Sequence, residues 1–470
     1  MLKIDGHRFR NCDGQSRRSF VQAGAIGLGA LGGFSLPELL RAEGGGSSQK
    51  SIIHIHLDGG PPQMDMIDPK PDSPVEVRGE FDSIPTKLPG VHVTELMPKT
   101  AQIADKLIFL RSLVGSAGRH DAFQCQSGFN VKDLAGLGGH PAMGCVVNQL
   151  LGSPSDAAPA FVDIMQGRGQ LRRSARPGFL GPVYKPFQPD ISHLFHRELE
   201  AGMKGELARL KREAPPTNLS LSDGVTLGRL EDRVGLLNGL DSIRAEVDAS
   251  GSMGAKDEFT QQAMQILTSG RMASALDLES EDPKVLAKFT PSWHRNPNQF
   301  YTGEGPEAAR KLLLARRLVE AGARVVSVSI SDWDTHSLNF SRMRDLVPIF
   351  DFAFHALVTD LEERGMLDDV TVLAWGEFGR TPRVNAKAGR DHWGRVAMGM
   401  MAGGGMNAGQ VIGATDRMAA EPTERPVHYQ DVIATLYHNL GIDARTTTVM
   451  DPTGRPQYLV DVGQPIRELI

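Results

Sequence analysis

The stretch RVVSVSISDWDTH, residues 324–336, carries an apolar strand pattern directly into two aspartates and a histidine. A second strand pattern, 370–375, breaks in a similar way at Trp375-Gly376-Glu377-Phe378-Gly379-Arg380-Thr381, and Arg390-Asp391-His392-Trp393 follows it. In open α/β sheets, ligands bind at the carboxyl ends of the strands. These segments therefore predict an α/β fold with a functional site at one edge of its sheet.

Strand and helix patterns alternate along much of the chain. We expect strands at 51–57, 107–113, 324–330, 370–375 and 396–402, and helices at 94–105, from about 119, and at 306–321, 344–364 and 428–440. Helix 306–321 has an inward face made by Leu312, Leu313, Ala315, Leu318 and Val319, and Gly322 suits its C-terminal cap. This alternation predicts a mostly parallel sheet covered by helices on both faces.

Residues from about 185 to 300 have a different composition. They are rich in Leu, Glu, Arg and Lys at helical spacing, for example at Leu227, Leu230, Val234, Leu237 and Leu240, and they contain no strong strand pattern. This segment predicts a helical insertion or cap on the sheet domain.

Residues 1–44 have the features of a twin-arginine export signal with its linker. Arg17-Arg18 precedes a Gly/Ala-rich apolar run, about 23–40, which is too short and too rich in glycine for a good membrane span. We expect cleavage near Ala42, a mature domain over 45–470, and a periplasmic or secreted protein that has used the twin-arginine export machinery. The alternatives are a buried N-terminal helix or a retained anchor.

Charge and cysteine content narrow the class of protein. Residues 1–44 carry a net charge of +2, so the remainder of the chain is near −7. This mild charge gives no reason to expect nucleic acid or an anionic membrane surface as a partner, and no other segment is apolar enough to span a membrane. Cys125 and Cys145 remain after cleavage and would be available for a disulfide in an oxidising compartment, but no cysteine pattern indicates a thiolate zinc site.

Asp334, His336 and His392 are the strongest candidates for metal ligands. Asp334 and His336 are two residues apart on an extended segment, so their side chains lie on the same side. His392 follows a later strand, as a ligand from a separate loop should, and Asp391 beside it is a further candidate. Such oxygen and nitrogen ligands suit zinc, manganese or magnesium. An isolated Asp-x-His is otherwise most often a surface turn.

Glu377 and Arg380 lie in the loop after strand 370–375. Glu377 is expected as a ligand or as a carboxylate that supports one. Arg380 would bind an anionic oxygen of a substrate or form a structural ion pair with Glu377.

The first strand supplies another candidate ligand, Asp58, directly at its end. Asp65 and Asp68 are nearby alternatives, although an Asp-Pro pair such as Asp68-Pro69 is more often a turn initiator. His54 and His56 alternate with apolar residues within the strand, and we expect both to be packed there.

A third candidate segment, Gly118-Arg119-His120-Asp121, is expected to open the helix after strand 107–113. Ser116 is a candidate nucleophile and His120 a candidate base or ligand, because a helix N-terminus favours anions and activated nucleophiles. Ordinary helix capping is the alternative for Ser116.

The order of these elements resembles that of the alkaline phosphatase superfamily. More closely, the chain resembles a bacterial family of exported proteins within it, the domain of unknown function family 1501. The matching stretches are Gly59-Gly60-Pro61 through Asp68-Pro69-Lys70-Pro71, residues 314–322, Trp333-Asp334-Thr335-His336, residues 376–382 and Asp391-His392-Trp393. The resemblance runs from residue 51 to the end of the chain and implies a three-layer α/β/α sandwich.

The same resemblance implies a chemistry. The superfamily hydrolyses or transfers phosphate and sulfate esters with one or two metal ions. Asp334, His336 and His392 match its first metal site, and Asp58 and Glu377 match parts of the second. Three features depart from the superfamily pattern: Phe378 stands where a metal-binding histidine is usual, Gly118 stands where a nucleophile is usual, and the sulfatase Cys-x-Pro-x-Arg pattern is absent.

The sequence therefore predicts an exported hydrolase of anionic phosphate or sulfate esters. It would use one or two divalent ions, zinc or another transition metal, with Arg380 or Arg119 to hold the anion and either water or Ser116 as the nucleophile. Two alternatives remain: a metal-binding protein that reuses the fold without catalysis, and a mutase or transferase that forms a covalent phospho-enzyme.

Overall fold

A sheet with strand order β11-β4-β10-β7-β1-β6-β5 forms the centre of the computed structural model, which describes residues 50–153, 156–171, 174–213 and 270–470. Its strands are β1 (Ser51–Leu57), β4 (Leu107–Val114), β5 (Phe161–Ile164), β6 (Val325–Ile330), β7 (Val370–Trp375), β10 (Ala397–Gly403) and β11 (Gln410–Ile412), and β14 (Val427–His428) also pairs with β4. All described residues except the last three of α6 (Met143–Leu151) belong to one compact unit.

The sheet is mostly parallel, as predicted. β1 pairs in parallel with β6 and β7, and β5 pairs in parallel with β6. β10 is antiparallel to both β4 and β7, so those two strands run in the same direction. The strands β1, β6 and β7 are buried along their whole length, which explains why they appear in the sequence as nearly continuous apolar runs.

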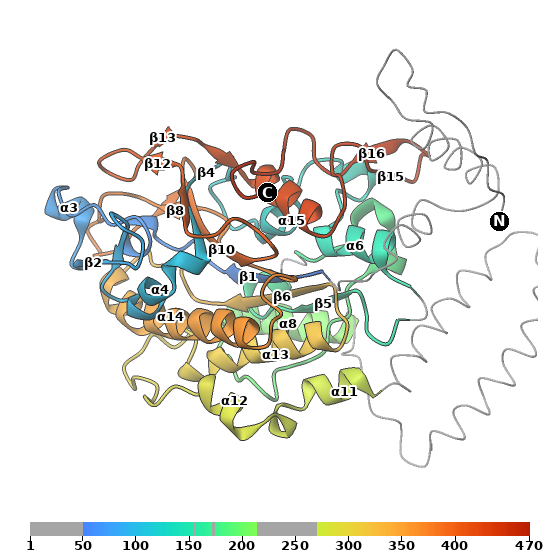
Figure 1. Cartoon of the computed structure of the whole chain (residues 1–470), viewed down its shortest axis with the longest axis horizontal. Coiled ribbons are helices and arrows are strands. Elements are labelled where there is room, and N and C mark those ends of the chain that lie inside the picture. Colours follow the sequence, from blue (N-terminus) through green and yellow to red (C-terminus); the bar gives the residue numbers. More distant parts are fainter. Residues whose placement is uncertain (1–49, 154–155, 172–173, 214–269) are drawn as a thin grey trace, which may run out of the picture. The chain divides into compact units, whose positions relative to one another are not determined.

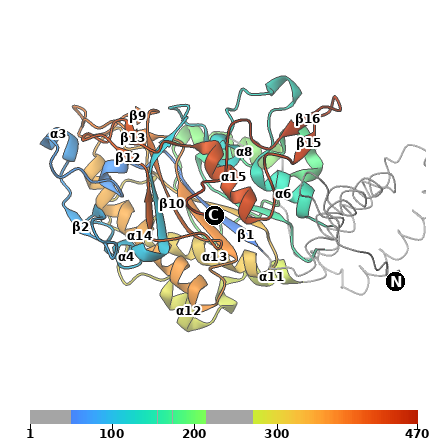
Figure 2. The same cartoon turned by 45° about the horizontal axis from the view of Figure 1, so that its top comes forward.

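Helices cover both faces of the sheet and complete the predicted three-layer α/β/α sandwich. Figures 1 and 2 show α13 (Ala309–Glu320) and α14 (Asn339–Glu363) on one side and α15 (Tyr429–Asn439) on the other. The remaining α-helices within the described residues are α3 (Val75–Arg78), α4 (Pro98–Gln102), α5 (Ala122–Ser127), α7 (Arg168–Leu171), α8 (Ala201–Glu213), α11 (Arg271–Leu276) and α12 (Pro283–Lys288).

Short elements complete the described part of the chain. The small two-stranded sheets pair β2 (Ser83–Pro85) with β3 (His92–Thr94), β8 (Gly379–Arg380) with β9 (His392–Trp393), β12 (Ala414–Thr415) with β13 (Pro422–Glu424), and β15 (Thr448–Met450) with β16 (Pro456–Tyr458). The 3-10 turns are Gln63–Asp65, Ala104–Lys106, Ala135–Leu137, Gly178–Leu180, Pro182–Tyr184, Leu278–Ser280 and Pro306–Ala308.

The core follows from the apolar pattern of these elements. The five predicted inward-facing residues of α13 are all buried, in a cluster that includes β1 and β6 side chains. Helix α14 begins at Asn339, five residues before the predicted start. Asn339 accepts a hydrogen bond from Thr335 Oγ1 (2.7 Å) and donates one to Asp65 Oδ2 (2.7 Å), so tertiary contacts stabilise its first turn.

Two further helix predictions need correction. Thr94 belongs to β3, where its N–H donates to Met66 O at 2.8 Å, so the predicted helix 94–105 is reduced to α4 and a short 3-10 turn. Pro98 starts α4 because it lacks the N–H that a helix interior requires. Helix α5 begins at Ala122 instead of Arg119, because Gly118 is left-handed (φ +63°) and the following residues form a loop.

Several predictions involve residues that are not described. The twin-arginine segment, 1–44, and the centre of the predicted insertion, 214–269 with Leu227 to Leu240, lie outside the described residues. The described flanks of the insertion contain α8, α11 and α12. Within the described residues, no helix is long and apolar enough to cross a membrane. Cys125 and Cys145 are both buried free thiols, so the disulfide that the sequence would allow does not form between them.

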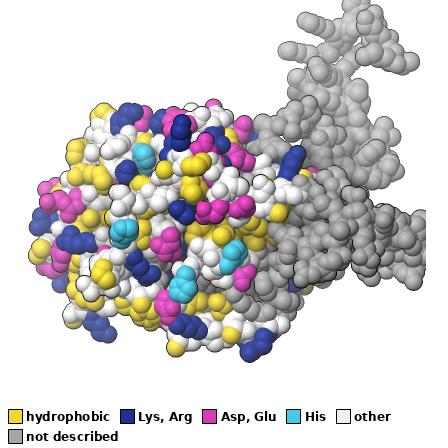
Figure 3. Space-filling model, turned by 90° about the horizontal axis from the view of Figure 1, so that it is seen from below, with side chains coloured by type: hydrophobic (Ala, Val, Ile, Leu, Met, Phe, Trp, Pro, Cys, Tyr) yellow, Lys and Arg dark blue, Asp and Glu magenta, His cyan; other side chains and the backbone are white. Residues whose placement is uncertain are grey.

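Acidic and basic side chains are interspersed on the face of the molecule shown in Figure 3. Other acids are buried, among them Asp163 on β5, which accepts hydrogen bonds from Gln188 Nε2 (2.7 Å) and the Met165 N–H (3.2 Å). Burial raises the pKa of Asp163 to about 6, because a carboxylate is poorly solvated there.

The Asp163→Asn variant is expected to change how stability depends on pH. The folded protein keeps the Asp163 proton up to about pH 6, whereas the unfolded chain loses it near pH 4. Between these pH values the folded state binds more protons than the unfolded state. The contribution of Asp163 to the free energy of unfolding therefore falls by roughly 3 kcal/mol as the pH rises. In urea titrations from pH 4 to 7, the stability of Asp163→Asn relative to the wild type should therefore rise with pH.

Asp72→Asn, at an exposed position, is the matched control. Its stability relative to the wild type should stay constant over the same range. If Asp163→Asn behaved like this control, burial of Asp163 would not raise its pKa.

Candidate metal centre

The candidate residues from the sequence converge at one edge of the central sheet. Asp58 follows β1, Asp334 and His336 follow β6, and Glu377 follows β7. His120 lies in the loop after β4, which runs in the same direction as β7. The carboxyl ends of these strands therefore bring side chains that are far apart in the sequence into one group.

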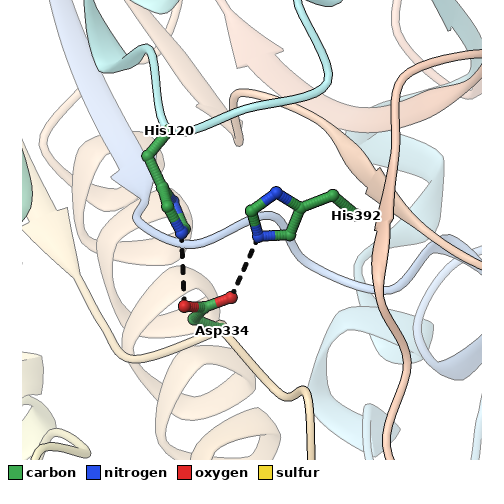
Figure 4. Close-up of side chains that lie close together, drawn as sticks. All are labelled: His120, Asp334 and His392. Atoms are coloured by element: carbon green, nitrogen blue, oxygen red, sulfur yellow. Dashed lines mark hydrogen bonds and ion pairs between the residues drawn. The ribbon is translucent and has the colours of Figure 1, made fainter. Parts of the chain in front are cut away.

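The outer cluster comprises His120, Asp334, His336 and His392. Asp334 Oδ1 lies 3.1 Å from His336 Nε2 and 3.3 Å from His392 Nε2, while Asp334 Oδ2 lies 3.2 Å from His120 Nε2. Figure 4 shows His120 and His392 directed at the two oxygens of this carboxylate. His336 Nε2 is also 3.1 Å from His392 Nε2. Ligand atoms of His120, Asp334 and His392 all lie within 4.8 Å of one another, close enough to bind one ion.

Asp391 lies on the other side of the His336 ring. Its Oδ1 is 2.7 Å from His336 Nδ1, and its Oδ2 accepts a hydrogen bond from Asn385 Nδ2 at 3.2 Å. This contact directs the opposite nitrogen, Nε2, towards Asp334, as carboxylates commonly do for metal-binding histidines. The structure thus places Asp391 in contact with the candidate ligand His336 and outside the outer cluster.

The inner cluster comprises His56, Asp58 and Glu377, all buried. His56 Nε2 lies 3.5 Å from Glu377 Oε2 and 3.9 Å from Asp58 Oδ1. Glu377 also accepts from the Gly59 N–H at 3.1 Å, and Asp58 Oδ2 accepts from Ser331 Oγ at 3.3 Å. Asp58 Oδ1 and both His56 ring nitrogens are buried without a hydrogen-bond partner. Because buried polar atoms are nearly always satisfied, these orphaned atoms indicate room for a ligand.

His120 connects the two clusters through its two ring nitrogens. Nδ1 is 3.1 Å from Glu377 Oε1, and Nε2 faces Asp334. Burial disfavours a charged imidazole, but the hydrogen bonds to Asp334 and Glu377 outweigh it and raise the pKa of His120 to about 9. The sequence singled out His120, and the structure puts it between the acids.

The carboxylates of the site differ in their electrostatic environments. Burial would raise the pKa of Asp334, but hydrogen bonds from His120 and His392 and the charge of Arg380 hold it well below its usual range. Burial and the neighbouring Glu377 charge raise the pKa of Asp58. Burial also acts against a charged Glu377, yet its contacts with His120 and His56 lower its pKa. The two carboxyl groups of the inner cluster are thus shifted in opposite directions, Asp58 towards the protonated form and Glu377 towards the ionised form.

Arg380 is fully buried and uses its guanidinium within the protein. Its Nε donates to Gly60 O (3.0 Å), its Nη1 to Arg390 O (2.9 Å) and its Nη2 to Asp334 Oδ1 (2.6 Å). It therefore forms an ion pair with Asp334, whereas the sequence left open a pair with Glu377 or contact with an anionic oxygen. The bonds also fix the β8–β9 pairing, in which Arg380 lies opposite His392.

Ser116 lies beside the site with its hydroxyl occupied. Oγ donates to the backbone oxygen of Glu377 at 2.6 Å and accepts from the Gly118 N–H at 3.0 Å. Both Ser116 and His120 precede α5, which has only six residues, so neither lies within a helix N-terminus. Ser116 therefore links the loop after β4 to the loop after β7.

Phe378 forms one wall of the outer cluster. Its ring centroid is 4.1 Å from that of His392 and 5.3 Å from that of His120. Gly60 accommodates this ring, since a Cβ at Gly60 would come within 2.4 Å of it. Phe378 therefore restricts the two imidazoles and presents an apolar surface to the outer cluster.

The alternatives to Asp58 lie elsewhere. Asp65 forms a buried two-pronged ion pair with Arg390, with Nε–Oδ2 at 2.8 Å and Nη2–Oδ1 at 2.9 Å, and also accepts from Asn339. Asp68 pairs with Lys70 at 3.0 Å and accepts a hydrogen bond from Thr415. Both acids are committed to structural partners.

Sequence analysis missed two residues of the site. His56 was assigned to strand packing, although it lies in β1 two residues before Asp58, so that both side chains are on the same side of the chain, and this spacing would have indicated it.

The second missed residue is Arg168, which follows β5, a strand that was not predicted. Its guanidinium contacts Asp332 (2.9 Å) and Asp334 (3.1 Å), and its N–H donates to Asp58 Oδ2 (3.2 Å). No motif surrounds Arg168 in the sequence. His54, in contrast, is packed as predicted and accepts from Trp375 Nε1 at 2.8 Å.

Comparison with known proteins identifies the family of the chain. Residues 49–470 match the model of a family described as "Protein of unknown function (DUF1501)", so the chain belongs to this family. No curated protein matches the chain.

Solved structures give weaker similarities. The lipoteichoic acid synthase LtaP from Listeria monocytogenes is 9% identical with a TM-score of 0.35, covering 84% of this chain and 72% of its own. The PsFucS1 sulfatase from Pseudoalteromonas sp. is 11% identical with a TM-score of 0.35, covering 88% and 71%. The phosphonate monoester hydrolase of Agrobacterium radiobacter is 14% identical with a TM-score of 0.31, covering 83% and 74%. Similarities at this level do not carry an activity from one protein to another.

Replacing Asp65 by alanine is expected to destabilise the protein strongly. Arg390 is fully buried, and loss of Asp65 would leave its charge without a carboxylate partner, at a cost of about 3–5 kcal/mol. Urea denaturation of the purified variant measures this change.

Glu80→Ala is the matched control, because Glu80 pairs with Arg344 at 3.1 Å on the surface. Its loss should cost at most about 1 kcal/mol. Equal effects of the two substitutions would contradict the anchoring role of Asp65.

Proposed function

We propose that this member of the DUF1501 family is an exported, metal-dependent hydrolase of phosphate or sulfate esters. The observation that carries the proposal is the pair of adjoining clusters, in which acids and imidazoles from five segments meet at the carboxyl edge of the sheet. Nitrogen and oxygen donors in this combination suit zinc or another transition metal.

The residues present fit one or two divalent ions. The first ion would be held by Asp334, His336 and His392, with His120 close enough to join them. The second would be held by Asp58 and Glu377, with His56 beside them. The orphaned atoms Asp58 Oδ1 and His56 Nε2 support this second position, because a cation would satisfy both. Bound there, a divalent ion supplies Lewis acidity towards an ester oxygen and makes water a stronger nucleophile.

The protein's own groups would bind and orient the ester. Arg168 contacts both clusters, and we propose that it holds an anionic oxygen of the substrate, together with the exposed Arg119 at the rim. Arg380 would act indirectly, since its guanidinium is buried and bound to Asp334 and backbone oxygens. Because the Ser116 hydroxyl is hydrogen-bonded to the backbone, we propose direct attack by water.

A second candidate function is metal binding without catalysis. Phe378 favours it, because this ring lies against His392 and His120 where a further ligand would be needed for a complete two-metal site. Both candidate functions require a bound metal ion, but only the hydrolase turns over an ester substrate.

Metal content is the measurement that tests the proposal first. Elemental mass spectrometry of the wild type should find one or two equivalents of a divalent transition metal per chain. The His336→Ala/His392→Ala variant removes two of the three ligands proposed for the first ion, so it should lose at least one equivalent. His294→Ala/His438→Ala, which replaces two exposed histidines, is the matched control and should keep the wild-type content.

Turnover then separates the two functions. The metal-loaded wild type should hydrolyse 4-nitrophenyl phosphate or 4-nitrophenyl sulfate, and the ligand variant should lose this activity by a factor of about 100 or more. Bound metal with no turnover on a broad ester panel would favour the non-catalytic function. A wild type that takes up no metal even after refilling would refute both.

A further inference from the structure

A small polar cavity lies beside the candidate metal centre, between the end of β5 and the segment that leads into α8. It has a volume of about 60 Å³, and its walls include Gln166, Gly167, Asp190, Arg197, Leu199 and Leu207. A water molecule needs about 10–15 Å³ measured in this way, so the cavity has space for a few waters or one short polar group.

Two buried polar atoms on the cavity walls have no hydrogen-bond partner. They are Gln166 Oε1 and Arg197 Nε. The rest of each side chain is held in place: Gln166 Nε2 donates to Phe195 O at 3.2 Å, and Arg197 Nη1 pairs with Glu304 Oε1 at 2.8 Å. Gln166 is 8% exposed, and the side chain of Arg197 is 7% exposed. Because unsatisfied buried groups are costly, a bound molecule is expected to contact both atoms.

The chemistry of these two atoms selects a hydroxyl group. Gln166 Oε1 accepts a hydrogen bond and Arg197 Nε donates one, and a hydroxyl is the simplest group that can do both in return. The charges near the cavity balance, since Arg197 and Lys311 are matched by Glu304, which contacts both, and by Asp190. A neutral hydroxyl therefore suits the cavity better than a second anionic group.

The cavity lies within reach of an ester bound at the metal centre. Gln166 is two residues before Arg168, so their Cα atoms are at most about 7.6 Å apart. Arg168 donates its N–H to Asp58 and its guanidinium to Asp334. Gly167 between them is left-handed (φ +72°), and a Cβ there would lie 3.2 Å from Arg197 Cζ, so the glycine lets the guanidinium pack against the backbone.

We propose that this cavity is a subsite for a hydroxyl group on the alcohol part of the ester. The substrate would then be a phosphate or sulfate ester of a polyol or carbohydrate, with one hydroxyl-bearing arm in the cavity and its carbon atoms against Leu199 and Leu207. The inference rests on the proposed function and specifies its substrate class.

The test compares two esters that differ only in their hydroxyl groups. For the metal-loaded wild type, kcat/KM is measured with 1-glyceryl phosphate and propyl phosphate, and with the corresponding sulfates. The glyceryl ester should be preferred by roughly tenfold or more, because the propyl ester leaves Gln166 and Arg197 unpaired. In Gln166→Leu, which removes the acceptor, and in Leu207→Phe, which narrows the cavity from its α8 wall, this preference should fall to about twofold or less.

The ratio of the two rates is measured within each variant, so a general loss of folded enzyme affects both rates equally. Val75→Ala, at a position that is 65% exposed, is the control and should keep the wild-type ratio. A wild type that hydrolyses both esters equally, or two cavity variants that keep the preference, would overturn the subsite.

A second measurement tests the subsite independently of the proposed function. If no ester is hydrolysed, including the 4-nitrophenyl esters, the proposed function fails. If only the aryl esters turn over, the proposed function stands. In either case, saturation-transfer NMR with glycerol tests the cavity directly. A signal in the wild type that is lost in both cavity variants would support a hydroxyl site, and no signal in the wild type would refute it.

Discussion

The carboxylate of Asp334 organises the charges around it. It contacts the guanidinium groups of Arg380 and Arg168 and the imidazoles of three histidines, which come from segments that follow β4, β5, β6 and β7. These groups lie in loops or in elements of only two to four residues, which the backbone alone would hold weakly. One ionised acid at the centre therefore determines where five other side chains point. Without it, the buried Arg380 would have no carboxylate partner, which is a costly arrangement.

A second acid stabilises the loops from outside the site. Asp65 binds Arg390, which precedes Asp391 and His392, and it also binds Asn339, whose side chain accepts from Thr335. The segments that carry two of the three histidines of the outer cluster, His336 and His392, are thus connected through one buried carboxylate. The Arg390 N–H also donates to Thr335 O at 2.9 Å, which adds a direct bond between the loops. This double connection gives the imidazoles a fixed separation without any ligand.

Local pattern was sufficient to predict much of the fold. β1 and β7 have the predicted bounds, and β6 begins within one residue of its predicted start, because buried strands are short apolar runs with clear ends. The predicted helix at 94–105 failed because Thr94 is held in β3 by a contact with Met66, which lies far away in the sequence. The antiparallel direction of β10 could not be predicted either, since strand direction depends on connections and not on composition.

The candidate site was likewise only partly predictable from local sequence pattern. Asp334 and His336 were predictable as candidates because they lie in a short polar motif directly after a strand pattern, and His392 because it lies in the Arg390–Trp393 motif that follows the next strand. The partners of Arg380 and Asp391 were not, because a side chain's choice among nearby acids depends on distances of a few tenths of an ångström. Arg168 was missed for another reason: its position depends on an edge strand of only four residues, which has too few residues to show a periodic pattern.

Exposure falls steadily from the outer to the inner cluster. The side chain of His336 is 46% exposed, that of Asp334 is 12% exposed, and those of Asp58 and Glu377 are 1% exposed. Two ions held in this arrangement would exchange with solvent at very different rates. A chelator would remove the outer ion first, and the inner ion would leave only when the protein opens around it. The order in which the protein is loaded with metal, and the stage of folding at which this happens, would then determine which ions the finished molecule carries.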